Sequence, residues 1–492
     1  MKFKAKPGRW DKTDAQISTL FVTEDLWSKD KTHYDRELAG LSTYLHNVNF
    51  EAKEGQIELF PTLGKIKSGM VAVVGMGKSA DLNLDVIRKT SARLARRFKS
   101  KQPKIIALDL TSELFIKLDL RTVVHTVVEA MVLGSYKYDK YHTQSKKEPQ
   151  SIAEVWLLVN TSRLQHATYG VTDGELTASA TIFARDLVNE SPTVTTPTYL
   201  AQVAKSLAKR GEVQVEILEE KAVRKMGMNS FLAVARGSNE APKFIKLIYK
   251  GGKKKVVVAG KAVTFDTGGL NLKDWQNMST MKLDMAGGAA VLGLFSVLPN
   301  LRPKATVIGL IAACENMPGA SAMKQGDVVT AMNGKTIEIL HTDAEGRLTL
   351  ADVLSYAVKE KPDYIVDLAT LTGACMVALG EEIAGLFVNH EGLRSKLKTA
   401  VDSAGELVWE LPLVKEYKDA LKSDFADLRN IGKTRYGGAI TAALFLEEFV
   451  DKLPWAHLDI AGPAFAEKDT PLAAYGGTGF GVRTLIQFLK NL

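Results

Sequence analysis

The stretch "KVVVAGKAV" (Lys255–Val263) is a nearly continuous run of valine and small residues. Strands that are apolar on both faces are typical of a sheet covered by helices on both sides. Two similar runs follow, "ATVIGLIAA" (Ala305–Ala313) and "DYIVDLATL" (Asp363–Leu371). Helical patterns alternate with them, for example "LTLADVLSYAVKE" (Leu348–Glu360) and "GGAITAALFLEEFVDKL" (Gly437–Leu453). We therefore predict a C-terminal α/β domain with a central mixed, largely parallel sheet flanked by helices.

The first third of the chain shows a second α/β pattern of short apolar runs and amphipathic helical segments. Its strand-like runs are "STLFVTE" (Ser18–Glu24), "MVAVVGM" (Met70–Met76), "KIIALDL" (Lys104–Leu110) and "EVWLLV" (Glu154–Val159). A helical stretch over Asp173–Val188 then leads into "NESPTVTTPTYL", whose Pro and Thr content is typical of a connector. Because 492 residues exceed one ordinary core, we predict two α/β domains, over 1–165 and 196–492, joined by a linker helix and connector over 166–195.

Composition indicates a globular protein of the cytoplasm. Hydrophobic residues make up 46% and charged residues 24% of the chain, which is typical of a folded domain. The longest apolar stretch, Ala286–Leu298, is shorter than the roughly 20 residues that span a bilayer. No apolar segment follows the charges of "MKFKAKPGRWDK", so we expect neither a signal peptide nor a membrane partner. Cys314 and Cys375 lie in apolar surroundings, which favours buried free thiols in a reducing compartment.

The net charge of +8 is unevenly distributed. The segment "RKTSARLARRFKSKQPK" (Arg88–Lys104) carries eight basic residues and no acid. A basic helical face of this kind can bind nucleic acid. The alternative is a solvated helix face followed by a linker, and no recognised DNA-binding motif accompanies the segment.

Two motif readings are disfavoured. "VVGMGKSAD" (Val73–Asp81) resembles the end of a phosphate-binding loop, but Ala72 stands where that loop needs glycine, and a third glycine of the dinucleotide fingerprint is missing. The eight histidines form no HExxH or other zinc-motif spacing. A nucleotide site and a histidine-based metal site are therefore not expected, whereas a carboxylate-based metal site remains open.

The stretch "HTDAEGRLTL" (His341–Leu350) places Asp343, Glu345 and Arg347 at alternate positions before a hydrophobic run. In an extended segment these three side chains would share one face. A solvated strand edge would explain them, and so would a site that needs negative charge and directed donors.

Further acids follow other predicted strands. Asp266 ends "GKAVTFDTGGLNLK", Asp284 lies in "MKLDMAGGAA", and both segments are rich in glycine. Each acid taken alone is more often a surface residue. If these two converge with Asp343 and Glu345, four partly buried carboxylates require cations, and two divalent ions would balance their charge.

At this point the chain resembles the leucyl aminopeptidase family, di-metal enzymes that remove N-terminal residues from peptides. The match is strong from about Arg185 to the C-terminus and loose before residue 160. The segments that carry it, in family order, are "GKAVTFDTGGLNLK", "MKLDMAGGAAVLG", "ENMPGASAMKQGDVV", "TDAEGRLTLADVL", "DLATLTGA" and "WAHLDIAGPAF…GGTGFGVRTL".

The resemblance implies two divalent metal ions per subunit, Zn or Mn, with Co or Mg as further options. By motif, Asp266 and Glu345 would bridge both ions. Asp343 would complete one metal site, and Lys261 and Asp284 would complete the other. Lys261 would have to be neutral, and without the resemblance it would be read as a surface lysine.

The resemblance also implies catalytic roles and a mechanism. Lys273 would donate to the scissile carbonyl oxygen, and Arg347 would hold a bicarbonate that acts as general base towards a metal-bridging water. A peptide with a free, unprotonated N-terminus would be the substrate, preferably with Leu or Met first. The wall around that first side chain would comprise Met281, Thr370, Leu371, Gly373, Ala461 and Ala464. Ordinary core packing is the alternative for Met281 and the two alanines.

Two residues depart from the family pattern, His341 in place of Asn and Ala262 in place of Gly. His341 could touch a metal, order a carboxylate behind the ligands, or change the polarity of the pocket, and we favour the second option. Ala262 could shift the adjacent Lys261. The resemblance further implies a homohexamer in the cytoplasm, and the alternative function is a DNA-binding or regulatory protein acting through segment 88–104.

Overall fold

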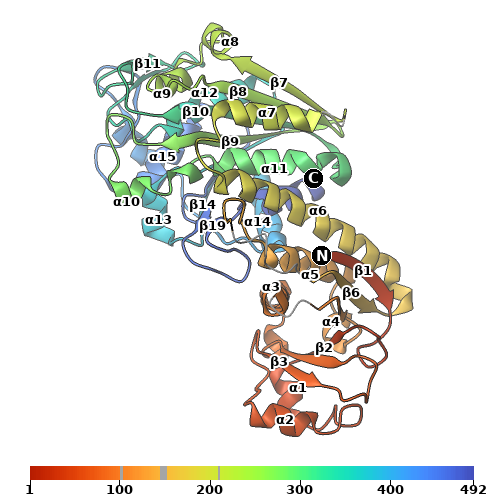
Figure 1. Cartoon of the computed structure of the whole chain (residues 1–492). Coiled ribbons are helices and arrows are strands. Elements are labelled where there is room, and N and C mark those ends of the chain that lie inside the picture. Colours follow the sequence, from red (N-terminus) through yellow and green to blue (C-terminus); the bar gives the residue numbers. More distant parts are fainter. Residues whose placement is uncertain (100–102, 144–151, 209–210) are drawn as a thin grey trace. The chain divides into compact units, whose positions relative to one another are not determined.

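The computed structural model describes residues 1–99, 103–143, 152–208 and 211–492. It divides into two compact units, one comprising residues 1–179 and 468–474 and the other residues 180–467 and 475–492. The boundary at 179/180 falls within the long helix α6 (Leu164–Asn189) (Figure 1). None of the helices in the described ranges is long and apolar enough to span a membrane.

The first unit contains a six-stranded sheet in the order β1-β6-β5-β2-β4-β3. All neighbouring strands are parallel except the β3–β4 pair. The strands are β1 (Lys2–Pro7), β2 (Ile17–Val22), β3 (Ile57–Pro61), β4 (Met70–Gly75), β5 (Ile105–Asp109) and β6 (Glu154–Val159). Its helices, in addition to the first part of α6, are α1 (Glu24–Lys29), α2 (Leu41–Asn47), η1 (Ser79–Asp81), α3 (Leu84–Lys99), α4 (Glu113–Ile116), α5 (Leu120–Ser135) and η3 (Thr161–Arg163).

The basic segment begins within α3, and residues 100–102 lie outside the described residues. Arg88 is buried, with Nε 3.6 Å from Oε1 of the buried Glu129. Arg93 pairs with Glu54 at 3.2 Å, and the Arg96 Nε donates to the Gly134 carbonyl. The expectation of one solvated basic face was therefore wrong for Arg88, because this guanidinium is part of the packing between α3 and α5.

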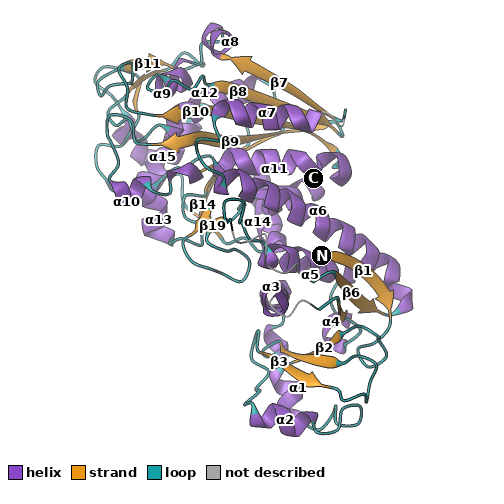
Figure 2. Cartoon of the chain, in the orientation of Figure 1, coloured by secondary structure: helices purple, strands orange, loops and turns teal. Residues whose placement is uncertain are grey.

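The second unit is built on an eight-stranded sheet in the order β15-β14-β17-β13-β9-β10-β8-β7. Figure 2 shows strands of this sheet in orange, among them β7, β8, β9 and β10. The strands are β7 (Val213–Glu219), β8 (Lys243–Lys250), β9 (Lys254–Asp266), β10 (Ala305–Asn316), β13 (Tyr364–Ala369), β14 (Ala384–Val388), β15 (Val408–Glu410) and β17 (Trp455–Asp459). Two small sheets comprise β11 (Val328–Thr330), β12 (Thr336–Glu338) and β16 (Leu428–Arg429), and β18 (Phe465–Ala466) with β19 (Gly476–Gly477).

The longer helices of this unit cover the large sheet. They are α7 (Pro197–Ala208), α11 (Ala286–Leu301), α12 (Gly346–Lys359), α14 (Glu391–Ala404), α15 (Gly438–Glu447) and α16 (Val482–Lys490). Shorter helical segments are α8 (Glu220–Lys225), α9 (Asn229–Ala235), α10 (Trp275–Met278), η4 (Met281–Leu283), α13 (Gly373–Leu379) and η5 (Lys415–Leu421).

The predicted fold class is confirmed at the centre of this sheet. The three apolar runs form β9, β10 and β13, which are neighbours and parallel, and β17 continues the parallel set. The β8 and β14 strands then pair antiparallel on either side, which makes the sheet mixed. Val257 and Ala259 of β9 pack in one core cluster with residues of α12 and α15, while the alternate residues of this strand point to the other face. Parallel strands end at the same edge, and loops at that edge carry the predicted site residues.

Candidate active site

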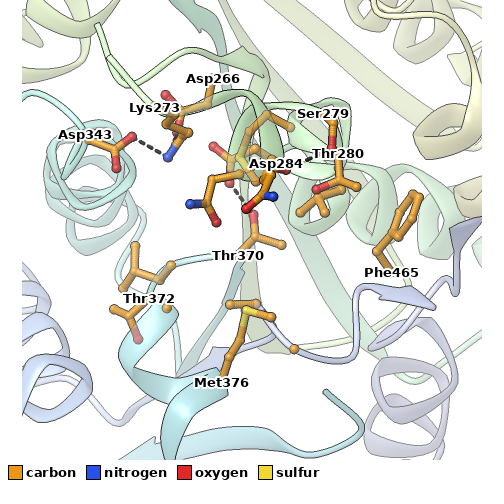
Figure 3. Close-up of a pocket in the computed structure, with 18 of the residues that line it drawn as sticks. Asp266, Lys273, Ser279, Thr280, Asp284, Asp343, Thr370, Thr372, Met376 and Phe465 are labelled. Atoms are coloured by element: carbon orange, nitrogen blue, oxygen red, sulfur yellow. Dashed lines mark hydrogen bonds and ion pairs between the residues drawn. The ribbon is translucent and has the colours of Figure 1, made fainter. Parts of the chain in front are cut away.

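Four predicted acids converge at the carboxyl edge of the central strands, and Figure 3 labels Asp266, Asp284 and Asp343 among them. Asp266 is the last residue of β9. Asp284 follows the 3₁₀ turn η4 and precedes α11. Asp343 lies in a loop, and Glu345 is the N-cap residue of α12. Asp343 and Glu345 share one loop, whereas Asp266 and Asp284 come from two other segments, so the fold brings these three parts of the chain together.

The "DAEGR" segment is not extended, and that expectation was wrong. Asp343 lies in a turn, and Arg347 is in the first turn of α12, which begins at Gly346. The preceding strand β12 belongs to a small three-stranded sheet and not to the large one. The carboxylates and the guanidinium gather here because a loop enters a helix, so alternation along a strand does not explain their spacing.

Lys261 lies at the centre of the site. Its Nζ is 2.6 Å from Asp284 Oδ1, 2.7 Å from Glu345 Oε1 and 2.7 Å from the Thr370 carbonyl oxygen. The side chain passes Gly346 so closely that a Cβ there would lie 2.6 Å from Lys261 Cε. A side chain at residue 346 would therefore displace the Lys261 ammonium group from its contacts with Asp284 and Glu345.

Lys273 pairs with the other two acids. Its Nζ lies 2.9 Å from Asp266 Oδ2 and forms an ion pair with Asp343 (Figure 3). The second oxygen of Asp266 accepts from the Asn316 amide at 2.8 Å. Asp284 Oδ1 also accepts from the Thr370 hydroxyl at 2.7 Å. Two ammonium groups thus balance part of the charge of four carboxylates.

Burial and neighbouring charges shift the pKa values of the four carboxyl groups and the two lysine ammonium groups, often in opposite directions. Burial, together with the Glu345 carboxylate, raises the pKa of Asp266 to about 7, although the two lysines oppose it. Burial likewise raises the pKa of Asp284 and of Asp343. Burial would lower the pKa of both lysines, but the surrounding carboxylates outweigh it and hold both pKa values above the ordinary one. For Glu345, burial would raise the pKa, and the two lysines reverse this and lower it.

The donor set fits divalent cations. One carboxylate oxygen from each of Asp266, Asp343 and Glu345 lies within 4.8 Å of the others. Asp284 Oδ2 is buried and has no hydrogen-bond partner among the described residues, a rare condition for a carboxylate oxygen. Hard oxygen ligands suit Mg, Mn and Zn, so these residues could hold metal ions.

Arg347 is buried beside this cluster, 8% exposed, and does not line the cavity described below. Its Nη1 donates to the Asn430 carbonyl at 2.9 Å, whereas its Nε has no hydrogen-bond partner within the described part of the chain. Burial lowers the pKa of Arg347 to about 10, against the opposing charges of Glu345 and Asp459. A buried guanidinium with an unused N–H can hold an anion.

Asn430 is a residue that sequence reasoning missed. It is fully buried. Its Oδ1 accepts from Leu340 N at 2.8 Å and His341 N at 3.3 Å, and its Nδ2 donates to the carbonyls of His341 at 2.7 Å and Ala344 at 3.4 Å. Its own carbonyl binds Arg347. One amide therefore holds the loop that carries Asp343 and Glu345, and no local sequence signal marks it.

A cavity of ≈ 870 Å³ opens over the four acids. Of the predicted pocket wall, Met281, Thr370, Leu371, Gly373 and Ala461 line it, whereas Ala464 is buried, 1% exposed, and does not. Further lining residues that the sequence did not point to are Ser279, Thr280, Thr372, Met376, Glu381, Phe465, Glu467 and Tyr475. Figure 3 shows Thr280 and Phe465 on one side of Asp284, with Thr372 and Met376 across from them.

The two departures from the family pattern lie in this region. His341 lines the cavity, and its backbone N–H and carbonyl are both bound by Asn430. It is not among the three residues whose ligand atoms cluster within 4.8 Å. Ala262 is fully buried in β9, while the neighbouring Lys261 reaches Asp284 and Glu345.

Comparison with known proteins decides the family. The catalytic-domain model of the cytosol aminopeptidase family matches residues 182–486, and the N-terminal-domain model of the same family matches residues 19–145. The chain belongs to the cytosol aminopeptidase family. The expected resemblance and the aminopeptidase class, a hydrolase acting on peptide bonds, are thereby confirmed.

Relatives in this family cover nearly the whole chain. The "Probable cytosol aminopeptidase" of Sulfurihydrogenibium sp. is 41% identical over 97% of this chain and 95% of its own. That of Alkaliphilus metalliredigens is 38% identical over 100% of both chains. Among solved structures, a tomato leucine aminopeptidase mutant superposes with a TM-score of 0.89 and 34% identity over 100% of this chain and 97% of its own. The bottromycin maturation enzyme BotP in complex with Mn gives 0.86 and 34% identity over 97% and 99%.

Proposed function

We propose that this aminopeptidase depends on two divalent metal ions and removes N-terminal residues, preferably Leu- or Met-like, from peptides. The observation that carries the proposal is the convergence of four acids and two lysines at one open cavity, from β9, the loop after it, the turn before α11 and the loop before α12. The orphaned Asp284 Oδ2 supports it, and so does the similarity to BotP, which has been solved in complex with Mn.

In this proposal Asp266 and Glu345 would contribute to holding both ions, Asp343 would help to hold one of them, and Lys261 and Asp284 would help to hold the other. The ions are Mn or Zn, with Co or Mg as alternatives. When bound, they supply Lewis acidity, which activates water and polarises a carbonyl group. Lys261 would have to be neutral to help hold an ion, and the positive charge of the ions would favour loss of its proton.

Lys273 orients and stabilises the reacting peptide group. Its ammonium lines the cavity and is held by Asp266 and Asp343 on the same side. From this position it donates to the scissile carbonyl oxygen, where negative charge develops during hydrolysis. Arg347 holds a bicarbonate ion through its unused N–H.

The first side chain of the substrate occupies the part of the cavity lined by Met281, Leu371, Met376 and Phe465. Apolar and uncharged walls favour Leu- or Met-like residues over charged ones. Thr370, Gly373 and Ala461 also line the cavity. Ala464 contributes only through the packing behind it, since it is buried.

We further propose a cytoplasmic enzyme, in line with the name of the relatives, and a homohexamer, which rests on the family resemblance alone. We keep the proposal that the His341 side chain orders a carboxylate behind the ligands; it lines the cavity but is not in the group of ligand atoms within 4.8 Å. Within the described part of segment 88–104, Arg88 is buried and Arg93 is paired with Glu54, so these two guanidinium groups do not support the DNA-binding alternative.

The test is hydrolysis of leucyl-p-nitroanilide by chelator-stripped protein before and after addition of Mn or Zn. We expect activity to return with metal and to be absent in Glu345→Ala. Glu416→Ala, an acid-to-alanine change at an exposed position, serves as the matched control. Folded protein that stays inactive with every metal would contradict the proposal.

A further inference from the structure

Two walls of the cavity meet at the C-terminal end of α6. One wall is the turn η4 and the residues before it, from which Thr280, Met281 and Leu283 line the cavity. The other wall is the β18–β19 pair, from which Phe465 and Tyr475 line it. These walls belong to segments far apart in the sequence, and neither is part of the large sheet.

The first wall is tied to α6 by a lysine. Lys282 Nζ donates to the carbonyl oxygen of Asn189 at 2.8 Å. Asn189 is the last residue of α6, and the final carbonyls of a helix have no partner within the helix. A cation at this position is favoured by the helix dipole as well. Lys282 is thus held between the pocket residues Met281 and Leu283.

The second wall is tied to the same residue. The Asn189 side-chain Oδ1 accepts from Gly477 N in β19 at 2.7 Å, in a buried contact. Gly476 has φ +122°, and a Cβ there would lie 2.3 Å from Asn189 Oδ1. Only glycine therefore allows the strand to approach this close.

The hydrogen bond between Asn189 and Gly477 is linked to the cavity through the pairing of β18 with β19. Gly477 pairs with Phe465, and the Phe465 ring packs edge-on against Tyr475 with centroids 5.3 Å apart. Displacement of β19 would therefore move both aromatic rings. Asn189 therefore contacts both walls: its backbone carbonyl binds Lys282 in the first wall, and its side-chain amide binds Gly477 in the second.

We propose that Asn189 and Lys282 form a latch that sets the width of the pocket for the first substrate side chain, and hence the preference among N-terminal residues. This inference rests on the proposed function and adds the elements that control its specificity. Both residues are positioning residues, since neither lines the cavity. The metal ligand Asp284 is held independently, by the Thr370 hydroxyl at 2.7 Å and by Lys261 at 2.6 Å. Opening the latch should therefore alter side-chain selection and leave metal binding intact.

The experiment compares kcat/KM for leucyl- and alanyl-p-nitroanilide in wild type, Lys282→Met and Asn189→Ala. Loss of a charge-assisted hydrogen bond is expected to reduce the leucyl-to-alanyl ratio by about tenfold, through KM rather than kcat. Asn189→Asp keeps an acceptor for Gly477 N and should retain more of the ratio than Asn189→Ala. Lys304→Met, at an exposed position before β10, is the matched control and should leave the ratio unchanged.

A merely structural role would lower kcat/KM equally for both substrates, in step with a lower melting temperature, and that result would overturn the proposal. The two latch residues are varied separately, so a misfolded Lys282→Met does not end the test. Binding of leucine hydroxamate and alanine hydroxamate to the Mn-loaded protein, followed by calorimetry, gives a readout without turnover. An unchanged preference in that assay overturns the latch, whereas absent hydrolysis in the wild type overturns the proposed function.

Discussion

Asn430→Ala should weaken metal binding although Asn430 contacts no proposed ligand atom. The substitution removes all four hydrogen bonds between the amide and the loop at residues 340–344, of which those to Leu340 N at 2.8 Å and to the His341 carbonyl at 2.7 Å are short. A fully buried backbone group left without a partner costs about 1–3 kcal/mol. Because the Leu340 and His341 groups are only partly buried, we take the lower end of that range, about 2 kcal/mol for both groups together. The loop can avoid this cost only by moving, and Asp343 and Glu345 would move with it.

The expected loss of metal affinity in Asn430→Ala can be set against this cost. Loss of a partner that orients a metal ligand typically reduces affinity by about 10–100-fold, which corresponds to about 1.4–2.8 kcal/mol. This loss of binding free energy is similar in size to the cost of the lost hydrogen bonds, so displacement of the loop can account for it. Calorimetric titration of chelator-stripped protein with Mn measures it directly. Asn333→Ala, an exposed asparagine in the turn between β11 and β12, is the matched control. Wild-type affinity in folded Asn430→Ala would refute the reasoning and show that other contacts hold the loop.

Three further outcomes are expected. Lys273→Met should reduce kcat on leucyl-p-nitroanilide by about 10²–10³-fold, because it removes a donor to the developing charge; a rise in KM alone would contradict that role. Burial raises the pKa of Asp352 to about 7, although N–H groups from Phe231 and Met332 oppose it. The folded state then binds more protons than the unfolded state between about pH 4 and 7, so stability falls as pH rises through that window; melting curves of wild type and Asp352→Asn should converge or cross there, and a constant difference would exclude the effect. Activity should be highest above neutral pH, because the substrate amine, with an ordinary pKa of about 8, must bind unprotonated; a maximum in acid would count against amine ligation.

The sequence was informative where structure depends on local pattern. The apolar runs of β9, β10 and β13 predicted strands of a largely parallel sheet covered on both faces, and the structure places these three strands side by side. Acids directly after those strands predicted a shared edge, and Asp266 lies there. The conformation around Asp343 could not be predicted in this way, because the loop is held by Asn430, 89 residues away from His341. A contact of this kind leaves no periodicity in the sequence, and the same holds for Asn189 and Gly477, 288 residues apart.

Three buried asparagines hold the loops of this site, and the type of side chain follows from the charges beside them. Asn316 binds Asp266 Oδ1 at 2.8 Å and the Thr342 carbonyl at 3.1 Å, Asn430 holds the next loop, and Asn189 holds the cavity walls. These loops lack the ladder bonds of a sheet, so their backbone groups need other partners. An amide offers a donor and an acceptor on one short, rigid group. At Asn316, which binds Asp266, aspartate would add charge to a cluster that already contains four carboxylates, and lysine would compete with cations for them. A neutral amide is thus the side chain that orders the loops without changing the charge that the site presents to metal ions.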